Sequence, residues 1–146
     1  MVYKAKKKDL DSLELLLKEL FTQEKEFVYK KGLHKKALKK ILENKKIGRI
    51  FVYKIEDKIV GMVSILFSYS TALGGKVGII EDMIVESDYR GLGVGNALLE
   101  HIMQYVKQKR LKRVTLLSDA DNSIAHKLYK KHGMKHSQMV VFRKGV

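Results

Sequence analysis

Residues 77–99 combine carboxylates set into an apolar run with three closely spaced glycines. Glu81 and Asp82 interrupt a β-branched stretch that predicts a strand. The amphipathic stretch that follows Gly91, Gly93 and Gly95 predicts a helix. Backbone without a Cβ atom can come close to a ligand, and the start of a helix offers unpaired N–H groups and the positive end of a dipole. This stretch therefore predicts a loop that binds phosphate mostly through the main chain.

The spacing of the glycines excludes two common phosphate-binding loops. A dinucleotide-binding fingerprint that starts at Gly91 needs a glycine where this chain has Asn96. A Walker loop needs Lys and then Ser or Thr after its last glycine, but Gly95 is followed by Asn96. What the chain does contain is Arg90-x-x-Gly93-x-Gly95, between a predicted strand and a predicted helix.

A second motif lies downstream of the glycine loop. Asn122 opens a predicted helix, Tyr129 follows seven residues later, and Gly133 with Met134 closes the helix. In order, spacing and context, the two motifs together resemble the GNAT superfamily of N-acetyltransferases, whose acetyl-CoA loop has the Arg-x-x-Gly-x-Gly pattern.

The resemblance implies a single N-acetyltransferase domain over residues 1–146 with an α/β (α+β) fold. Its sheet would be mixed and mostly antiparallel, with about six to seven strands, splayed at the cofactor site and covered by helices on both faces. Acetyl-CoA would be the co-substrate, without a metal. The residues that the resemblance assigns to its pyrophosphate are Arg90, Gly91, Leu92, Gly93, Val94, Gly95 and Asn96. The backbone of Met83, Ile84 and Val85 would pair with the pantetheine arm, and Asn122 would hydrogen-bond to it.

The same resemblance gives roles to two ionisable side chains. Tyr129 would be the general acid that protonates the departing CoA thiolate, and Glu81 the base that takes the proton of the amine through water. Glu81-Asp82 before an apolar triplet resembles the diamine and spermidine acetyltransferase branch. The residues themselves leave alternatives open: Tyr129 can simply anchor its helix, Glu81 can pair with a lysine, and Asp82 can replace Glu81. Strict alternation puts the two carboxylates on opposite faces of the strand unless a bulge intervenes.

The predicted function is transfer of the acetyl group of acetyl-CoA to a primary amine by direct attack in a ternary complex. A small amine or polyamine is the first expectation for the acceptor, and a protein or peptide amine the second. The competing class is a non-catalytic module that binds CoA or nucleic acid. Position alone indicates acceptor contacts at Phe21, Glu24, Glu26 and Asp82. A homodimer is left open.

The remaining elements must position these residues. The chain is predicted to begin with a strand at 2–6 and a helix that Asp9 caps and that reaches Phe21, followed by a helix at 33–44. Strands at 50–55 and 59–68 form a predicted hairpin before the central strand. After the glycine-loop helix come a strand at 113–118, a helix at 123–132 and a last strand at 139–143. Strands that first form hairpins and then alternate with helices predict a mixed sheet.

Composition excludes several other functions. The chain has no cysteine, which excludes disulfides, thiolate metal sites and Cys nucleophiles, and its five histidines show no metal-ligand spacing. The formal charge is +14, but residues 1–76 hold 18 Lys/Arg against 9 Asp/Glu and residues 77–146 hold 12 against 7. Because the excess is spread and no nucleic-acid motif accompanies it, a lysine-rich solvated surface is expected rather than a nucleic-acid partner. No signal peptide or membrane-spanning run is evident, which predicts a soluble cytoplasmic protein without a membrane partner.

Overall fold

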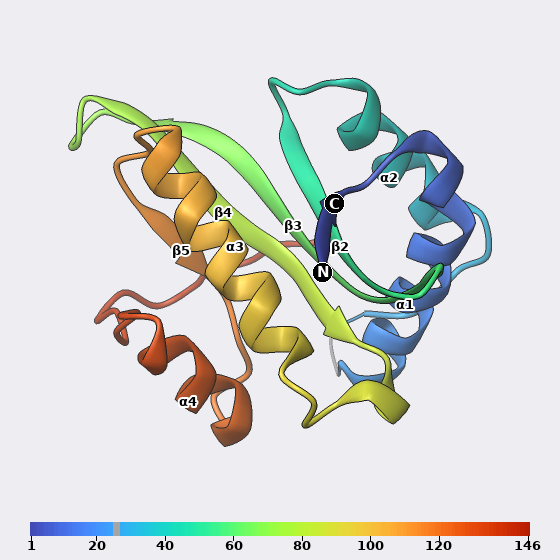
Figure 1. Cartoon of the computed structure of the whole chain (residues 1–146). Coiled ribbons are helices and arrows are strands. Elements are labelled where there is room, and N and C mark those ends of the chain that lie inside the picture. Colours follow the sequence, from blue (N-terminus) through green and yellow to red (C-terminus); the bar gives the residue numbers. More distant parts are fainter. Residues whose placement is uncertain (25–26) are drawn as a thin grey trace.

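The computed structural model of the chain describes residues 1–24 and 27–146 (Figure 1). Its centre is a sheet in the order β1-β2-β3-β4-β5. The first four strands are antiparallel neighbours, and β5 runs parallel to β4. Their bounds are β1 (Val2–Lys4), β2 (Gly48–Ile55), β3 (Lys58–Ser70), β4 (Gly75–Val85) and β5 (Val114–Leu116). The predicted mixed, mostly antiparallel sheet is confirmed.

Helices cover both faces of this sheet, as predicted (Figure 1). Leucines at helical spacing on α1 (Leu10–Gln23), together with Leu38 of α2 (Leu33–Glu43), form one core with β2, β3 and the end of β4. The apolar stripe of α3 (Val94–Gln108) forms the second core on the opposite face. Side chains of α4 (Ser123–Lys131) pack against that second core. Short 3-10 turns, Lys7–Asp9 and Ser87–Tyr89, precede α1 and the glycine loop.

A β-bulge lies in β4 at the two carboxylates. Val63 of β3 pairs with Met83 while Ile65 pairs with Ile80, so two residues of β4, Glu81 and Asp82, oppose Ser64 alone. A bulge adds one residue to a strand and shifts the alternation beyond it. Accordingly, Ile80 belongs to the core under α3, whereas Ile84 belongs to the core under α1.

The sheet separates beside this bulge. Strand β5 pairs with β4 only from Gly78↔Val114 to Ile80↔Leu116, whereas β4 continues to Val85. From Glu81 onward, β4 is therefore paired on the β3 side alone. The resemblance implies a splayed sheet at this place, and here the ladder between β4 and β5 ends.

The prediction of a last strand at 139–143 is wrong. The residues after α4 that the structure describes form no strand, and Met139, Val140 and Phe142 are largely exposed. Arg143 instead lies 5.8 Å from the ring centroid of Phe27, near α1 and α2. The described sheet consequently has five strands rather than six to seven. Within the described residues, no helix has the length and apolar character needed to cross a membrane.

Candidate active site

The glycine loop presents exposed main chain at the start of α3. Gly91 and Gly93 have φ angles of 76° and 83°, in the left-handed region that glycine adopts without strain. A Cβ atom at either position would meet no atom within 4 Å, so conformation rather than space requires glycine there. Gly93 is the N-cap of α3 and no side chain caps the helix. The first amides of α3 therefore keep their N–H groups free for an anion.

Gly95 marks the place where three elements meet. A Cβ atom built there would lie 3.5 Å from Leu128 of α4, 3.6 Å from Met83 and 3.8 Å from Val85 of β4. The start of α3 thus packs against both β4 and the helix that carries Tyr129. A methyl group fits at this contact, but a larger side chain would push the three elements apart.

Arg90 is exposed, but its side chain is held against the protein by two hydrogen bonds. Its Nε donates to the carbonyl oxygen of Val85 at 2.9 Å, and its Nη2 donates to Oε1 of Glu19 at 2.9 Å. The same Glu19 oxygen accepts from the backbone N–H of Ser87 at 2.9 Å. One carboxylate of α1 therefore braces the start of the loop, and Arg90 has other donors left for a phosphate.

The outer edge of β4 offers main-chain groups for an added strand. The N–H of Glu86 donates to the carbonyl of Val60, which fixes the alternation of the antiparallel ladder. By this alternation the backbone N–H and C=O of Ile84 face β3, whereas those of Met83 and Val85 face the edge of β4 that β5 does not cover. Of the three residues predicted to pair with pantetheine, Ile84 is thus occupied in the ladder, and the Val85 carbonyl is taken by Arg90.

At the bulge, Asp82 and Ser64 form a reciprocal pair. The wholly buried Ser64 hydroxyl accepts from the Asp82 N–H at 3.1 Å and donates to Oδ2 of Asp82 at 3.3 Å. Burial, and to a lesser degree the charge of Glu81, raise the pKa of Asp82 to about 6, although the hydrogen bond from Ser64 opposes both. Glu81 itself is exposed. The strand therefore carries one partly buried carboxylate that titrates near neutral pH and one that faces solvent.

Tyr129 is partly buried on α4. Burial raises the pKa of its phenol, the Ser118 hydroxyl lowers it, and the charge of Glu24 raises it. A phenol with a raised pKa keeps its proton at neutral pH, as a general acid must. The influence of Glu24 places the end of α1 within electrostatic range of Tyr129, although 104 residues separate them in the chain.

The two asparagines predicted to contact the cofactor both have protein partners. Asn122 caps α4, because its Oδ1 accepts from the N–H of Ala125 at 3.2 Å. The Oδ1 of Asn96 lies 2.9 Å from Nε2 of His132, which joins the first turn of α3 to the end of α4. The amide nitrogens of both side chains stay available as donors.

Of the four residues predicted to contact the acceptor, Phe21 and Glu24 lie at the end of α1, and Asp82 lies on β4. The Phe21 ring centroid is 5.8 Å from that of Phe27 and 4.8 Å from that of His34, so it belongs to an aromatic group between α1 and α2. Glu24 follows α1 directly. Glu26 lies outside the described residues.

The sequence reasoning missed three residues that support the site. Ser64 is the one hydroxyl residue within the apolar run 59–67 of β3, and that pattern was a usable signal. Glu19 and His132 act through contacts to residues far away in the chain, and no local pattern indicates them.

Two features define the class of protein. A glycine-rich turn begins α3, and this turn lies beside a sheet in which the β4–β5 ladder ends at a bulge. The chain belongs to the acetyltransferase (GNAT) family, whose sequence model matches residues 14–134. An uncharacterised N-acetyltransferase of Methanocaldococcus jannaschii is 29% identical over 136 residues, which cover 92% of this chain and 60% of that protein. Glucosamine 6-phosphate N-acetyltransferase of Trypanosoma brucei brucei is 30% identical over 90 residues, 61% of this chain and 59% of the relative. The chain thus spans about three fifths of the length of these curated relatives.

Solved structures share the fold across the whole chain. A possible acetyltransferase from Clostridium difficile 630 superposes with a TM-score of 0.89 at 20% identity, covering 100% of this chain and 97% of that one. An aminoglycoside acetyltransferase from a soil metagenome, solved with sisomicin, gives a TM-score of 0.81 at 21% identity, covering 100% and 95%. At these identities the likeness shows the fold.

Proposed function

We propose that this chain transfers the acetyl group of acetyl-CoA to the primary amine of a small molecule. The observation that carries the proposal is the uncapped start of α3, where the exposed loop of Gly91 and Gly93 lies beside the separated edge of β4. Membership of the acetyltransferase family supports the same activity.

The residues present fit acetyl-CoA. The free amides at the start of α3 suit a pyrophosphate, with Arg90 placed to add charge at the loop. Main-chain groups of Met83 and the N–H of Val85 suit an amide-containing arm that adds as a strand would. When bound, acetyl-CoA supplies a thioester, whose carbonyl carbon a neutral amine can attack.

Two proton transfers are assigned to this chain. The amine must lose a proton as its nitrogen bonds to the acetyl carbon, and the sulfur gains one as the C–S bond breaks. We assign the first proton to Asp82, directly or through water, because its pKa of about 6 suits a base at neutral pH. Glu81 raises that pKa and adds negative charge toward a cationic amine. Tyr129 donates the second proton.

A small cationic amine is the acceptor that the local charge favours. Residues 77–89 contain no Lys or Arg but include Glu81, Asp82, Glu86 and Asp88. Within a protein whose formal charge is +14, Glu81 and Asp82 of β4 would attract a cation, whereas Glu86 is already paired with Lys58 at 2.8 Å. The names of the relatives support an amino-group acceptor of small size, because they include a glucosamine 6-phosphate acetyltransferase and an aminoglycoside acetyltransferase. The resemblance of Glu81-Asp82 to the spermidine branch puts polyamines first in an acceptor panel.

Release of the CoA thiol in the presence of an amine panel tests the proposal. A thiol reagent gives a clean signal because the chain has no cysteine of its own. We expect turnover with at least one small amine and an acetylated product by mass spectrometry. Tyr129→Phe should lower kcat by about 100-fold or more, since general acid catalysis contributes that much, with acetyl-CoA affinity unchanged.

Tyr69→Phe is the matched control, because Tyr69 is an exposed tyrosine of β3. It should leave kcat unchanged. Equal rates for the wild type and Tyr129→Phe would reject the acid role of Tyr129. No turnover with any amine would reject the function itself.

A further inference from the structure

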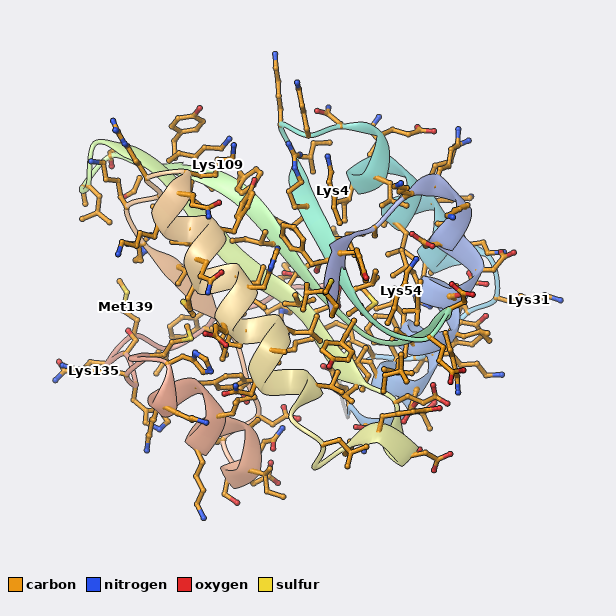
Figure 2. The ribbon with its side chains drawn as sticks, viewed as in Figure 1. Lys4, Lys31, Lys54, Lys109, Lys135 and Met139 are labelled. Carbon is orange, nitrogen blue, oxygen red and sulfur yellow. The ribbon has the colours of Figure 1, made fainter. Side chains whose placement is uncertain are left out.

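A cavity of about 280 Å³ lies at the end of α3 that is remote from the glycine loop. Three separate segments line it: the turn into β2, the β3–β4 hairpin and the last turn of α3. Its cationic residues, defined here as the basic pocket, are Lys45, Lys46, Arg49, Lys76 and Lys109. None of the described residues that line the cavity is a carboxylate. Figure 2 labels Lys109 at this end of α3.

The cations of the basic pocket have no ion-pair partner in the part of the chain that the structure describes. Other lysines have acidic partners, such as Lys7 with Glu43 at 3.0 Å and Lys58 with Glu86 at 2.8 Å. Clustered like charges create a strong local potential, which a bound anion would relieve.

Aromatic rings form the apolar wall of the cavity. Phe67 and Tyr105 stack with an interplanar angle of 19° and centroids 6.4 Å apart, and Phe51 packs edge-on against Tyr105 at 5.3 Å. The Nζ of Lys76 lies 4.2 Å from the centroid of Phe67, a cation–π contact that orients the ammonium group. An apolar wall also weakens solvent screening, so charge interactions beside it are stronger than on an open surface.

The end of α3 does not cancel this potential with free carbonyl groups. The N–H of Leu111 donates to the carbonyl of Val106, and the N–H of Arg110 donates to that of Lys107. These bonds form a Schellman cap, with Arg110 at φ 54° in the left-handed position. The carbonyls of Tyr105, Val106 and Lys107 in the last turn are thus paired within the chain, and the cations dominate the mouth of the cavity.

We propose that the basic pocket binds a small ligand with clustered phosphate groups, either a free oligophosphate or the phosphate tail of a nucleotide. Cations from three sides match a ligand that carries several charges, whereas a single carboxylate could engage only a few of them. The cavity volume is near the lower end of small-molecule sites, which run from about 300 to 1,000 Å³. The 15 residues of α3 separate this site from the glycine loop by about 22 Å, at 1.5 Å per residue.

Calorimetric titration with inorganic tripolyphosphate, and in parallel with ATP, tests the proposal in the full chain. We expect one site per chain that persists when CoA saturates the glycine loop. The double variant Lys45→Gln/Lys109→Gln changes two exposed side chains and should weaken binding by about tenfold or more. Lys76→Gln should weaken it too, through the cation–π-oriented ammonium group. If ATP binds more tightly than tripolyphosphate, the ligand is a nucleotide; equal affinities indicate the phosphates alone.

The control variant Lys31→Gln/Lys135→Gln removes the same charge at two positions away from Lys109 in Figure 2. It should change the affinity less than twofold. Equal losses in the control and the pocket variant would mean that overall charge, not the pocket, attracts phosphate. Loss of the site on addition of CoA would assign it to the glycine loop. Binding of an oligonucleotide without binding of tripolyphosphate or ATP would also overturn the proposal.

Discussion

The two ends of α3 are both suited to anions, but they are built from different parts of the chain. At the N-terminal end, Gly91 and Gly93 expose backbone amides, and the nearby Arg90 is tied to Glu19. At the C-terminal end the backbone is capped and side chains from three segments supply the charge. Main-chain recognition is therefore encoded in a few consecutive residues, whereas side-chain recognition depends on the tertiary fold.

The two regions should also respond differently to solution conditions. The site near the glycine loop contains a partly buried carboxylate whose pKa is about 6, so pH should act on it. The basic pocket contains lysines and an arginine, whose attraction for an anion is screened by salt, so ionic strength should act on it. Three substitutions test how far this contrast holds.

Asp82→Asn should have the largest effect, on the pH dependence of stability. Between the ordinary pKa of 3.8 and the folded value of about 6, folded Asp82 holds a proton that the unfolded chain has lost. The free energy of unfolding therefore falls as pH rises through this window. At about 1.4 kcal/mol per pKa unit, the loss reaches about 3 kcal/mol above pH 6. The free energy of unfolding of Asp82→Asn, measured in urea, should not show this loss. The difference in unfolding free energy, variant minus wild type, should therefore increase between about pH 4 and 7.

Asp57→Asn is the matched control, because Asp57 is exposed in the β2–β3 turn. Its stability difference from the wild type should stay constant across the same range. A constant difference for Asp82→Asn as well would contradict the raised pKa. If Asp82 is the base, the acid limb of the pH profile of kcat/KM should disappear in Asp82→Asn. An unchanged acid limb would assign that role to Glu81 or to water.

Glu19→Ala should have an intermediate effect, on cofactor binding. This change removes the carboxylate that accepts from Arg90 and from the N–H of Ser87, and so loosens the glycine loop. We expect acetyl-CoA to bind about tenfold more weakly, equivalent to about 1.4 kcal/mol, with kcat at saturation nearly unchanged. Glu43→Ala, which removes the ion pair with Lys7, should alter neither quantity. A fall in kcat without a change in affinity would mean that Glu19 does not act through the loop.

The sequence predicts features that depend on consecutive residues and misses those that depend on the tertiary fold. The glycine loop, Asn122 and Tyr129 lie on local patterns, and the structure places them at the start of α3 and on α4 as expected. The bulge lies opposite Ser64, which approaches Asp82 only after β3 and β4 pair. The basic pocket was invisible for the same reason, because the spread of charge along the chain says nothing about which lysines meet in space.

The predicted strand at 139–143 failed for a related reason. Its β-branched and aromatic residues have high strand propensity, but that propensity reflects packing against neighbouring strands. The structure gives this segment no partner strand, and Arg143 lies over Phe27 instead. Propensity can identify a segment that fits a sheet, but only the fold decides whether an edge is available to it.

The smallest effect is expected at the C-terminal end of α3, from Arg110→Gly. Each end of this helix has a residue in the left-handed region, but only the N-terminal one, Gly93, is a glycine. An L-residue there costs about 1–2 kcal/mol, and the greater freedom of glycine in the unfolded chain offsets part of the relief. We therefore expect a gain in unfolding free energy of up to about 1 kcal/mol in urea titrations.

Arg110→Ala separates conformation from charge, because it removes the guanidinium and keeps the Cβ atom. It should not reproduce the gain of Arg110→Gly. Equal stabilities for the two variants would show that charge repulsion near the basic pocket, rather than backbone strain at φ 54°, limits stability at this end. Since the Schellman bonds use backbone atoms alone, the glycine variant should keep the cap and, with it, the positions of the pocket lysines.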